Sequence, residues 1–392
     1  MRNKKKSGCG CGCFGIVLAI MAIYIAIYTM IGGAGEKNLS ESGAFQSTGG
    51  QGVRRVYEQL DDSQKMIYDQ LLEGVPQGNL GFWFDQATQP MFDEAYTAFQ
   101  YDHPECFWLS SGYRYNTERG GLKVDLATFN YWTYTSNPQM YIDQLNQKVD
   151  EIVAGGSQYS DTYDKVKYVH DYLVKHITYD HTAAEESNQT IRSTATEHAL
   201  SVYGALVNGK SICGGYSESF YLLMNAMGVE CYYLQGYAGE YHAWNYLKID
   251  GNYYYMDVTW DDVNLKDANG QPEYPQGVVY TYFCITSEEM GRSHTPDERF
   301  EAPVGMAKDY NYFRQEGYYF ETYHFAGVAS AFQKQAGQQI MSVQFGSAAE
   351  LTRALKDLID NGRIHELGCF ASGQSVSYGK DDSLYILTFY VK

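Results

Sequence analysis

The sequence predicts an α+β protein with a central unit and two flanking α+β units. Apolar residues between 162 and 227 recur at intervals of three and four, which is typical of amphipathic helices, whereas residues 229–258 alternate as strands do. The chain has 392 residues, more than one ordinary domain of about 100–200 residues. Its hydrophobic fraction of 44% is enough to bury a sizeable core, so wholesale disorder is excluded.

Charge is distributed unevenly along the chain. The 47 acidic residues outnumber the 29 basic ones and give a net charge of −18, so no nucleic-acid partner is expected, because phosphate binding requires clustered cations. Residues 1–35 hold four basic residues and no acidic one, for a charge of +4. The other 25 basic and 47 acidic residues give residues 36–392 a charge of −22.

An apolar run, residues 14–31, follows a basic tail, residues 1–13. Its eighteen residues would span roughly 27 Å as a helix, close to the bilayer core of about 30 Å. This length predicts a transmembrane helix, with a cleaved signal peptide, whose apolar region is usually about 7–15 residues, as the alternative. The positive-inside rule predicts a cytoplasmic tail and an extracellular body. We therefore expect a single-pass cell-membrane protein, or a secreted one if the segment is cleaved.

The remaining sequence divides into a stalk and three folded units. Residues 32–52 are rich in Gly and Ser and predict a flexible stalk. Residues 53–150 form an N-terminal accessory unit that begins with a helix over 53–72. Residues 300–392 form a C-terminal accessory unit, in which Ser347 and Glu350 predict a capping box at a helix start. A strand is expected there over residues 384–391.

Residues 157–295 form the central and most informative unit. Three helices are expected, near residues 163–177, 197–207 and 216–227. Gly228 is placed to end the third helix as its C′ residue. Three strand-like segments follow, at residues 229–237, 242–249 and 252–258.

One cysteine of this unit stands at a predicted helix start. Five cysteines follow the apolar run: Cys106, Cys213, Cys231, Cys284 and Cys369. Five is odd, so at least one stays unpaired unless it bridges to another chain. Cys213 follows a Gly-containing turn and opens the third helix, where the macrodipole and free N–H groups favour a thiolate. A thiolate is the nucleophile that acyl transfer needs.

A histidine and an aspartate are expected to meet on a hairpin. Asp250-Gly251 is a strong two-residue hairpin signal. If these two residues form the loop, paired residue numbers sum to 501, and His242 and Asp257 become diagonal neighbours on one face. A three-residue loop would instead place Asp257 on the opposite face. Together with Cys213 the pair predicts a Cys–His–Asp catalytic triad. Taken singly, each residue also has a structural interpretation: an inert core thiol, a core or surface histidine, and a turn cap.

Several motifs agree in order and spacing with one family. They are ICGGYS at 212–217, YHAWN at 241–245 and YMDVTWDD at 255–262, preceded by YVHDYLVKHITY at 168–179 and YGAL at 203–206. The region 157–295 resembles the bacterial transglutaminase-like superfamily. The resemblance implies a papain-like α+β core in which Cys213 forms a thioester, His242 acts as base and acid, and Asp257 orients His242. It implies a structural role near the site for Trp260 and Asp261. No tryptophan close before Cys213 matches the oxyanion-supporting residue of the animal enzymes.

These observations predict a cell-surface, transglutaminase-like cysteine enzyme. It would attack a peptide or carboxamide carbonyl and pass the acyl group to water or to an amine, because both outcomes use the same triad. No cofactor and no metal are expected. The expected partners are a protein or peptide substrate, which could include a cell-wall peptide, and the membrane through the N-terminal helix. The alternative is a non-catalytic surface binding or scaffold protein whose Tyr-rich flanking units supply recognition surfaces.

Overall fold

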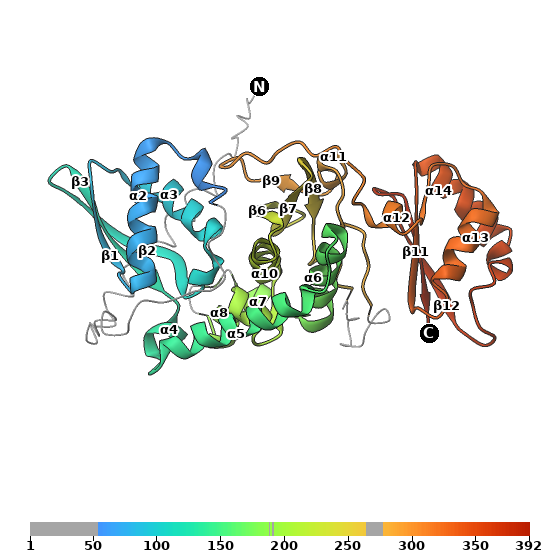
Figure 1. The fold of residues 1–392 in the computed structure, drawn as a ribbon, viewed down its shortest axis with the longest axis horizontal. Helices are drawn as coiled ribbons and strands as arrows, with labels where there is room; N and C mark the ends of the chain where they lie inside the picture. The colour runs from blue at the N-terminus through green and yellow to red at the C-terminus, as the bar shows by residue number, and fades with distance from the viewer. Residues whose placement is uncertain (1–53, 188, 190–191, 264–276) are drawn as a thin grey trace, which may run out of the picture.

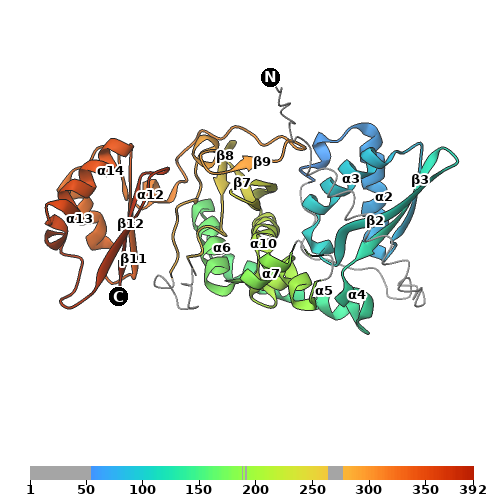
Figure 2. The ribbon, with the colours of Figure 1, turned by 180° about the vertical axis from the view of Figure 1, so that it is seen from behind.

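The computed structural model describes residues 54–187, 189, 192–263 and 277–392. Three units lie in a row along the long axis, in chain order (Figure 1), and the view from behind shows the same order (Figure 2). The basic tail 1–13, the apolar segment 14–31 and the stalk 32–52 lie outside the described residues. Among the residues that are described, no helix combines the length and the apolarity needed to cross a bilayer.

The first unit packs two helices against a three-stranded antiparallel sheet. The helices are α2 (Asp62–Gly74) and α3 (Gln89–Asp102), and the strand order is β1-β3-β2, with β1 at Gly81–Asp85, β2 at Leu109–Glu118 and β3 at Gly121–Thr128. Aromatic side chains join the two layers: the ring of Phe92 on α3 lies 4.7 Å from Tyr113 and 5.5 Å from Phe84. Short elements complete the unit: η2 (Tyr57–Gln59), η3 (Val75–Gln77), η4 (Pro104–Cys106) and α4 (Asn130–Tyr134).

The central unit places helices against a four-stranded antiparallel sheet. The strand order is β8-β7-β6-β9, with β6 at Glu230–Tyr237, β7 at Tyr241–Ile249, β8 at Asn252–Met256 and β9 at Thr295–Pro296. Its helices are α5 (Pro138–Gly156), α6 (Thr162–His176), α7 (His181–Glu186), α8 (Thr194–Ala199), α9 (Val202–Leu206), α10 (Cys213–Ala226) and α11 (Ser287–Met290). Two further strands, β4 (Thr178–Tyr179) and β5 (Lys210–Ser211), pair in parallel. Helix α10 packs on β6 and β7, so its first residue faces the hairpin.

Local signals set both ends of the central helices. Asp161 caps α6 by accepting a hydrogen bond from the Tyr163 N–H. Gly228 follows α10 with a φ of +77°, the left-handed conformation expected of a C′ glycine. The single helix expected near 197–207 is instead two helices, α8 and α9. Ser201 breaks it, because its backbone is extended and its side chain caps α9 at the Gly204 N–H.

The third unit covers a mixed sheet with helices. The strand order is β10-β11-β13-β12, with β10 at Tyr319–Phe320, β11 at Ile340–Phe345, β12 at Val376–Asp381 and β13 at Ile386–Val391. Its helical segments are α12 (Tyr312–Gln315), α13 (Phe325–Lys334), α14 (Ala348–Leu355), the π-turn Lys356–Asp360 and η6 (Arg363–Glu366). The rings of Tyr280 and Tyr312 stack 3.7 Å apart and connect this unit to the central one.

The predicted capping box of α14 forms only by half. Ser347 accepts a hydrogen bond from the Glu350 N–H, as expected. The Glu350 carboxylate, however, accepts the N–H of Tyr323, 2.8 Å away, rather than returning to Ser347. The Glu350 carboxylate, which the local motif assigns to the helix cap, therefore binds the distant residue Tyr323 instead.

Candidate active site

Cys213 is the first residue of helix α10, as the sequence predicts. Ile212 before it is extended, and the first hydrogen bond of the helix runs from the Tyr216 N–H to the Ile212 carbonyl. The amides of the first turn precede that bond and form the positive end of the helix, where Cys213 lies. The other described cysteines are buried, and Cys213 is partly exposed. All five of these cysteines are free thiols, so none of them pairs with another.

The start of α10 fits closely against the preceding loops at Gly215. A Cβ atom built there would lie 2.0 Å from Ser211 Oγ and 2.7 Å from the carbonyl oxygen of Ser201. The backbone oxygen cannot move without displacing the α9 cap. The absence of a side chain at Gly215 therefore lets the helix start, with Cys213, lie against this loop.

We expect Gly215→Ala to destabilise the protein and to displace the helix start. Overpacking of this kind costs about 1–3 kcal/mol in the free energy of unfolding. Urea unfolding followed by circular dichroism measures the cost. Gly214→Ala is the matched control for chain entropy, because it lies in the same helix turn and the nearest atom to a Cβ there, the Leu200 carbonyl oxygen, is 3.8 Å away. Equal stability of Gly215→Ala and wild type would contradict the close fit.

The β7–β8 hairpin has the register that the sequence predicts. Ile249 pairs with Asn252 and Asn245 with Met256. Asp250 and Gly251 form the two-residue loop with φ values of 50° and 80°, the positive angles of a type I′ turn. The strand pairing ends at Met256. Asp257 follows directly, and its side chain lies on the same face of the hairpin as His242.

The hairpin brings His242 and Asp257 into direct contact. His242 Nε2 lies 2.8 Å from Asp257 Oδ2 and donates to it. Because Nε2 is engaged, the other ring nitrogen is left for the Cys213 thiol, which is near enough to help raise the pKa of His242. The side chain of Asp257 is fully buried, and its Oδ1 accepts the Trp260 N–H at 3.1 Å. The three residues predicted to act together are therefore contiguous.

Charge in this cluster favours an ion pair. Burial opposes the charged form of His242, but the charge and hydrogen bond of Asp257, together with Cys213, raise the pKa of His242 to about 10. Burial likewise disfavours ionised Asp257, but His242 and a second histidine, His294, lower the pKa of Asp257 to about 2. At neutral pH an imidazolium therefore stands between a carboxylate and the thiol.

These two pKa values give a stability contribution with a defined pH window. The raised pKa of His242 stabilises the fold fully below its unfolded value of 6.5, and this contribution is lost as pH rises through about 10. The lowered pKa of Asp257 contributes above 3.8 and is lost as pH falls through about 2. We expect the difference in free energy of unfolding between wild type and His242→Gln to be largest between about pH 4 and 6.5. Urea unfolding at each pH measures it, and a difference independent of pH would contradict the ion pair.

Sequence reasoning missed His294, which contacts the same carboxylate. His294 Nε2 lies 3.0 Å from Asp257 Oδ2, and the side chain is fully buried. It stands just before β9, whose residue Thr295 pairs with Tyr237 of β6. No local motif marks His294, because only the pairing of β9 with β6 brings it near Asp257. The sole sequence signal is a histidine at the start of a short extended segment.

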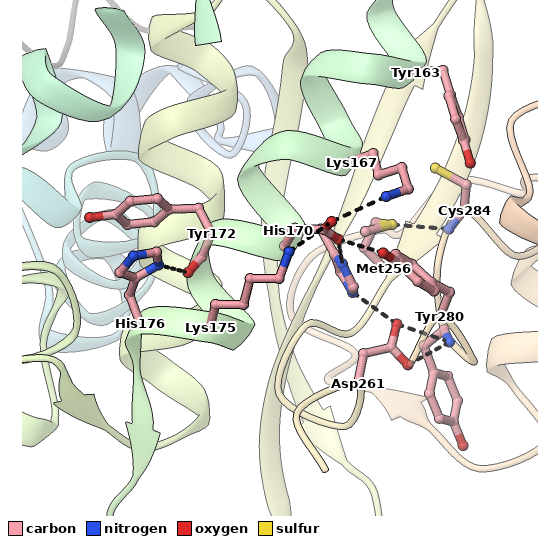
Figure 3. Close-up of polar contacts among 12 residues, drawn as sticks. Tyr163, Lys167, His170, Tyr172, Lys175, His176, Met256, Asp261, Tyr280 and Cys284 are labelled. Atoms are coloured by element: carbon pink, nitrogen blue, oxygen red, sulfur yellow. Dashed lines mark hydrogen bonds and ion pairs between the residues drawn. The ribbon is translucent and has the colours of Figure 1, made fainter. Parts of the chain in front are cut away.

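A second buried histidine–carboxylate pair lies between α6 and the segment after β8. The side chain of His170 points from α6 toward Asp261, and its Nε2 lies 3.1 Å from Asp261 Oδ2 (Figure 3). Asp261 Oδ1 also accepts the backbone N–H of Tyr282 at 3.0 Å. Burial raises the pKa of Asp261 to about 6, although His170 opposes this shift. The pair holds the segment after β8, which contains Asp257, against α6. This contact is consistent with a structural role for Asp261.

One group of described residues has the spacing of a metal site. Ligand atoms of His242, Asp257 and His294 all lie within 4.8 Å of one another. Both imidazole Nε2 atoms, however, already contact the same carboxylate oxygen. A metal ion among them would displace the proton that His242 holds on Nε2.

Residues 147–258 match the family model of the transglutaminase-like superfamily. The matched segment contains Cys213, His242 and Asp257 and overlaps the region 157–295 in which the sequence resembles that family. This segment of the chain is therefore similar to the transglutaminase-like superfamily. None of the curated proteins matches the chain.

Three solved structures are similar to parts of the chain. A crystal structure of a TGase is 19% identical, with a TM-score of 0.29, over 41% of this chain and 47% of that one. A candidate cysteine protease from Cytophaga hutchinsonii is 13% identical, with a TM-score of 0.23, over 38% and 61% of the two chains. A candidate protease from Parabacteroides distasonis is 10% identical, with a TM-score of 0.21, over 37% and 35%. The chain spans less than two thirds of the length of each.

Proposed function

We propose that the protein is a cysteine enzyme that attacks a peptide or carboxamide carbonyl through a thioester on Cys213. The observation that carries this proposal is the contiguous series of Cys213, His242 and Asp257. A partly exposed thiol at a helix start lies near an imidazole, and a buried carboxylate holds one nitrogen of that imidazole. A nucleophile beside a base that an orienting group holds is the combination of groups that acyl transfer uses, and this supports the proposal.

The reaction follows from the charges of the three groups. The Cys213 thiolate attacks the carbonyl carbon, and the new oxyanion lies near the N–H groups of the first turn of α10. The tetrahedral intermediate collapses when the His242 imidazolium gives its proton to the departing nitrogen, which leaves a thioester on Cys213. Water or an amine then attacks the thioester, and neutral His242 takes the proton of the incoming group. The C–S bond breaks as this second intermediate collapses, so the acyl product leaves and the Cys213 thiolate and the His242 imidazolium are restored. Asp257 keeps the ring oriented and the imidazolium stabilised in both halves.

Cell-surface action on protein or peptide substrates, including cell-wall peptides, is the second part of the proposal. It rests on the apolar segment 14–31 after a basic tail and on the acidic body that follows. Protease treatment of intact cells tests it. A chain degraded from outside, with a protected N-terminal fragment, supports the anchored form, and release into the medium supports the cleaved form. Full protection in intact cells and degradation only after lysis would contradict both.

Thiol alkylation tests the catalytic part most directly. The full chain in detergent is treated with iodoacetamide from pH 5 to 9, with Cys213→Ala and Cys369→Ala as matched variants. We expect rapid alkylation at pH 6–7 that depends on Cys213 and not on the buried Cys369. Alkylation no faster than that of an ordinary thiol, whose pKa is about 8.5, would contradict an activated nucleophile.

A second assay separates the two acyl acceptors and the non-catalytic alternative. Ammonia released from a glutamine-containing peptide measures thioester formation, and incorporation of a dansyl-labelled primary amine measures transfer to an amine. Ammonia without incorporation indicates hydrolysis. Exposed aromatic residues beside the site, Tyr237 at 60% and Tyr241 at 59%, would serve recognition in either case. Alkylation at Cys213 without turnover of any peptide amide or carboxamide would favour the binding or scaffold alternative.

A further inference from the structure

We propose that His294 is a positioning residue for the triad and holds the Asp257 carboxylate in the orientation that His242 requires. This inference rests on the proposed function and adds a residue to it. His294 lies outside residues 147–258, the segment that matches the transglutaminase-like family. It reaches the site from the segment that leads into β9.

The Asp257 carboxylate is held by three donors. Its Oδ2 faces two imidazole nitrogens, His242 Nε2 at 2.8 Å and His294 Nε2 at 3.0 Å. Its Oδ1 accepts the Trp260 N–H at 3.1 Å. The side chains of Asp257 and His294 are both fully buried, so protein groups supply the donors to this carboxylate in the wild-type site. His294 thus supplies one of the three contacts that fix the plane of this carboxylate.

The surroundings of His294 select the tautomer that can donate. Its Nδ1 lies 2.8 Å from Ser293 Oγ, which can give its hydroxyl proton to that nitrogen. Nε2 then carries the ring proton and donates to Asp257. The described titratable groups that face His294 are Asp257, His242 and Tyr282, whose hydroxyl lies 3.4 Å from Ser293 Oγ. The result is one hydrogen-bonded series from Ser293 through His294 and Asp257 to His242, whose ring lies near Cys213.

The backbone holds His294 in place independently of the triad. The next two residues, Thr295 and Pro296, pair with Tyr237 and Gly236 at the edge of the sheet. The ring also packs 5.0 Å from Trp244 and 4.6 Å from Trp260. A donor fixed by sheet and ring contacts restrains the carboxylate more than a mobile side chain or a water would.

Loss of His294 should therefore act on the chemical step. Without this donor, Oδ2 keeps only His242, and the carboxylate can turn about its last torsion and take the imidazole with it. Misplacement of a reacting group by about 1 Å costs about 100-fold in rate. The remaining carboxylate is also more basic, because His294 contributes to its ionisation. The acid limb of the curve of Cys213 alkylation rate against pH should therefore move to higher pH.

The test uses the full chain and two readouts, iodoacetamide alkylation of Cys213 against pH and ammonia release from a glutamine peptide. For His294→Ala we expect kcat to fall by about 10- to 100-fold with KM changed by less than about threefold. The acid limb of alkylation should rise by about half a pH unit or more. His294→Gln retains an N–H that can reach Oδ2, so it should recover most of the rate. His103→Gln is the matched control, because it removes another buried histidine–carboxylate contact, the one with Glu105 in the first unit; it should lower stability and leave the acid limb in place.

Two sets of results overturn the inference. One is an acid limb and a kcat per folded molecule that are unchanged in His294→Ala. The other is a His294→Gln variant as impaired as His294→Ala, which would assign His294 to packing alone. Failure of the proposed function gives a different pattern: wild type releases no ammonia, or Cys213→Ala releases it at the wild-type rate. The alkylation profile needs no substrate, so the effect of His294 on the triad is decided in that case as well.

Discussion

Replacement of Cys213 by alanine is expected to abolish turnover, with a loss of about 10⁴-fold or more in kcat. No other described cysteine can take over, because the remaining four are buried and burial raises the pKa of each. Without the sulfur no thioester forms, and the positive helix end and the imidazolium face no nucleophile. Ammonia release from a glutamine peptide measures turnover, and mass spectrometry of the trapped acyl-enzyme measures the intermediate.

Two variants make this result specific. Cys213→Ser keeps the size and hydrogen bond of the side chain but supplies a much poorer nucleophile, so it should fold as wild type does and lose nearly all activity. Cys369→Ala removes a buried thiol of the C-terminal unit and should keep full activity. Residual turnover in Cys213→Ala above about 1% of wild type would place the chemistry on another residue.

Replacement of Asp257 by asparagine is expected to reduce kcat by about 10³- to 10⁴-fold. Asparagine has nearly the same shape but no charge, so it cannot sustain the imidazolium of His242. Its amide can also present an N–H toward His242, which favours the wrong ring tautomer. The pKa of His242 should then fall well below its wild-type value of about 10, because burial is no longer opposed by the carboxylate.

Proton NMR of the histidine rings against pH tests the second part of this prediction without a substrate. His242 should stay charged through pH 8 in wild type and lose its charge at lower pH in Asp257→Asn. Asp257→Glu is a useful comparison, since it keeps the charge but shifts the carboxylate by a methylene group. If Asp257→Asn leaves both the rate and the His242 titration unchanged, the carboxylate has no part in the reaction.

The predictable part of the site consisted of local relationships. Asp250-Gly251 allowed one favourable loop, and the alternation of strand side chains then placed His242 and Asp257 on one face. The position of Cys213 followed from a turn and a helical period within the same stretch of chain. Transglutaminase-like motifs lie in these same local segments, which is why the resemblance and the register led to the same residues.

Features created by distant contacts were not predictable. His294 meets Asp257 only because β9 returns to the edge of β6, and nothing near residue 294 marks that pairing. Glu350 fits a capping box locally, but the backbone of Tyr323 takes its carboxylate. The helix expected near 197–207 divides at Ser201, where a side-chain cap outweighs the apolar period of the sequence. In each case a partner from another segment, or a competing cap, decided the outcome.

The five free thiols of the described chain have a practical and a biological consequence. Buried side chains, many of them aromatic, hold the described units together without a disulfide among Cys106, Cys213, Cys231, Cys284 and Cys369. Reducing agents should therefore protect the exposed sulfur against oxidation without loosening the fold. The redox state of the surroundings would then control the reactivity of the Cys213 sulfur, while the fold around this sulfur would not change with that state.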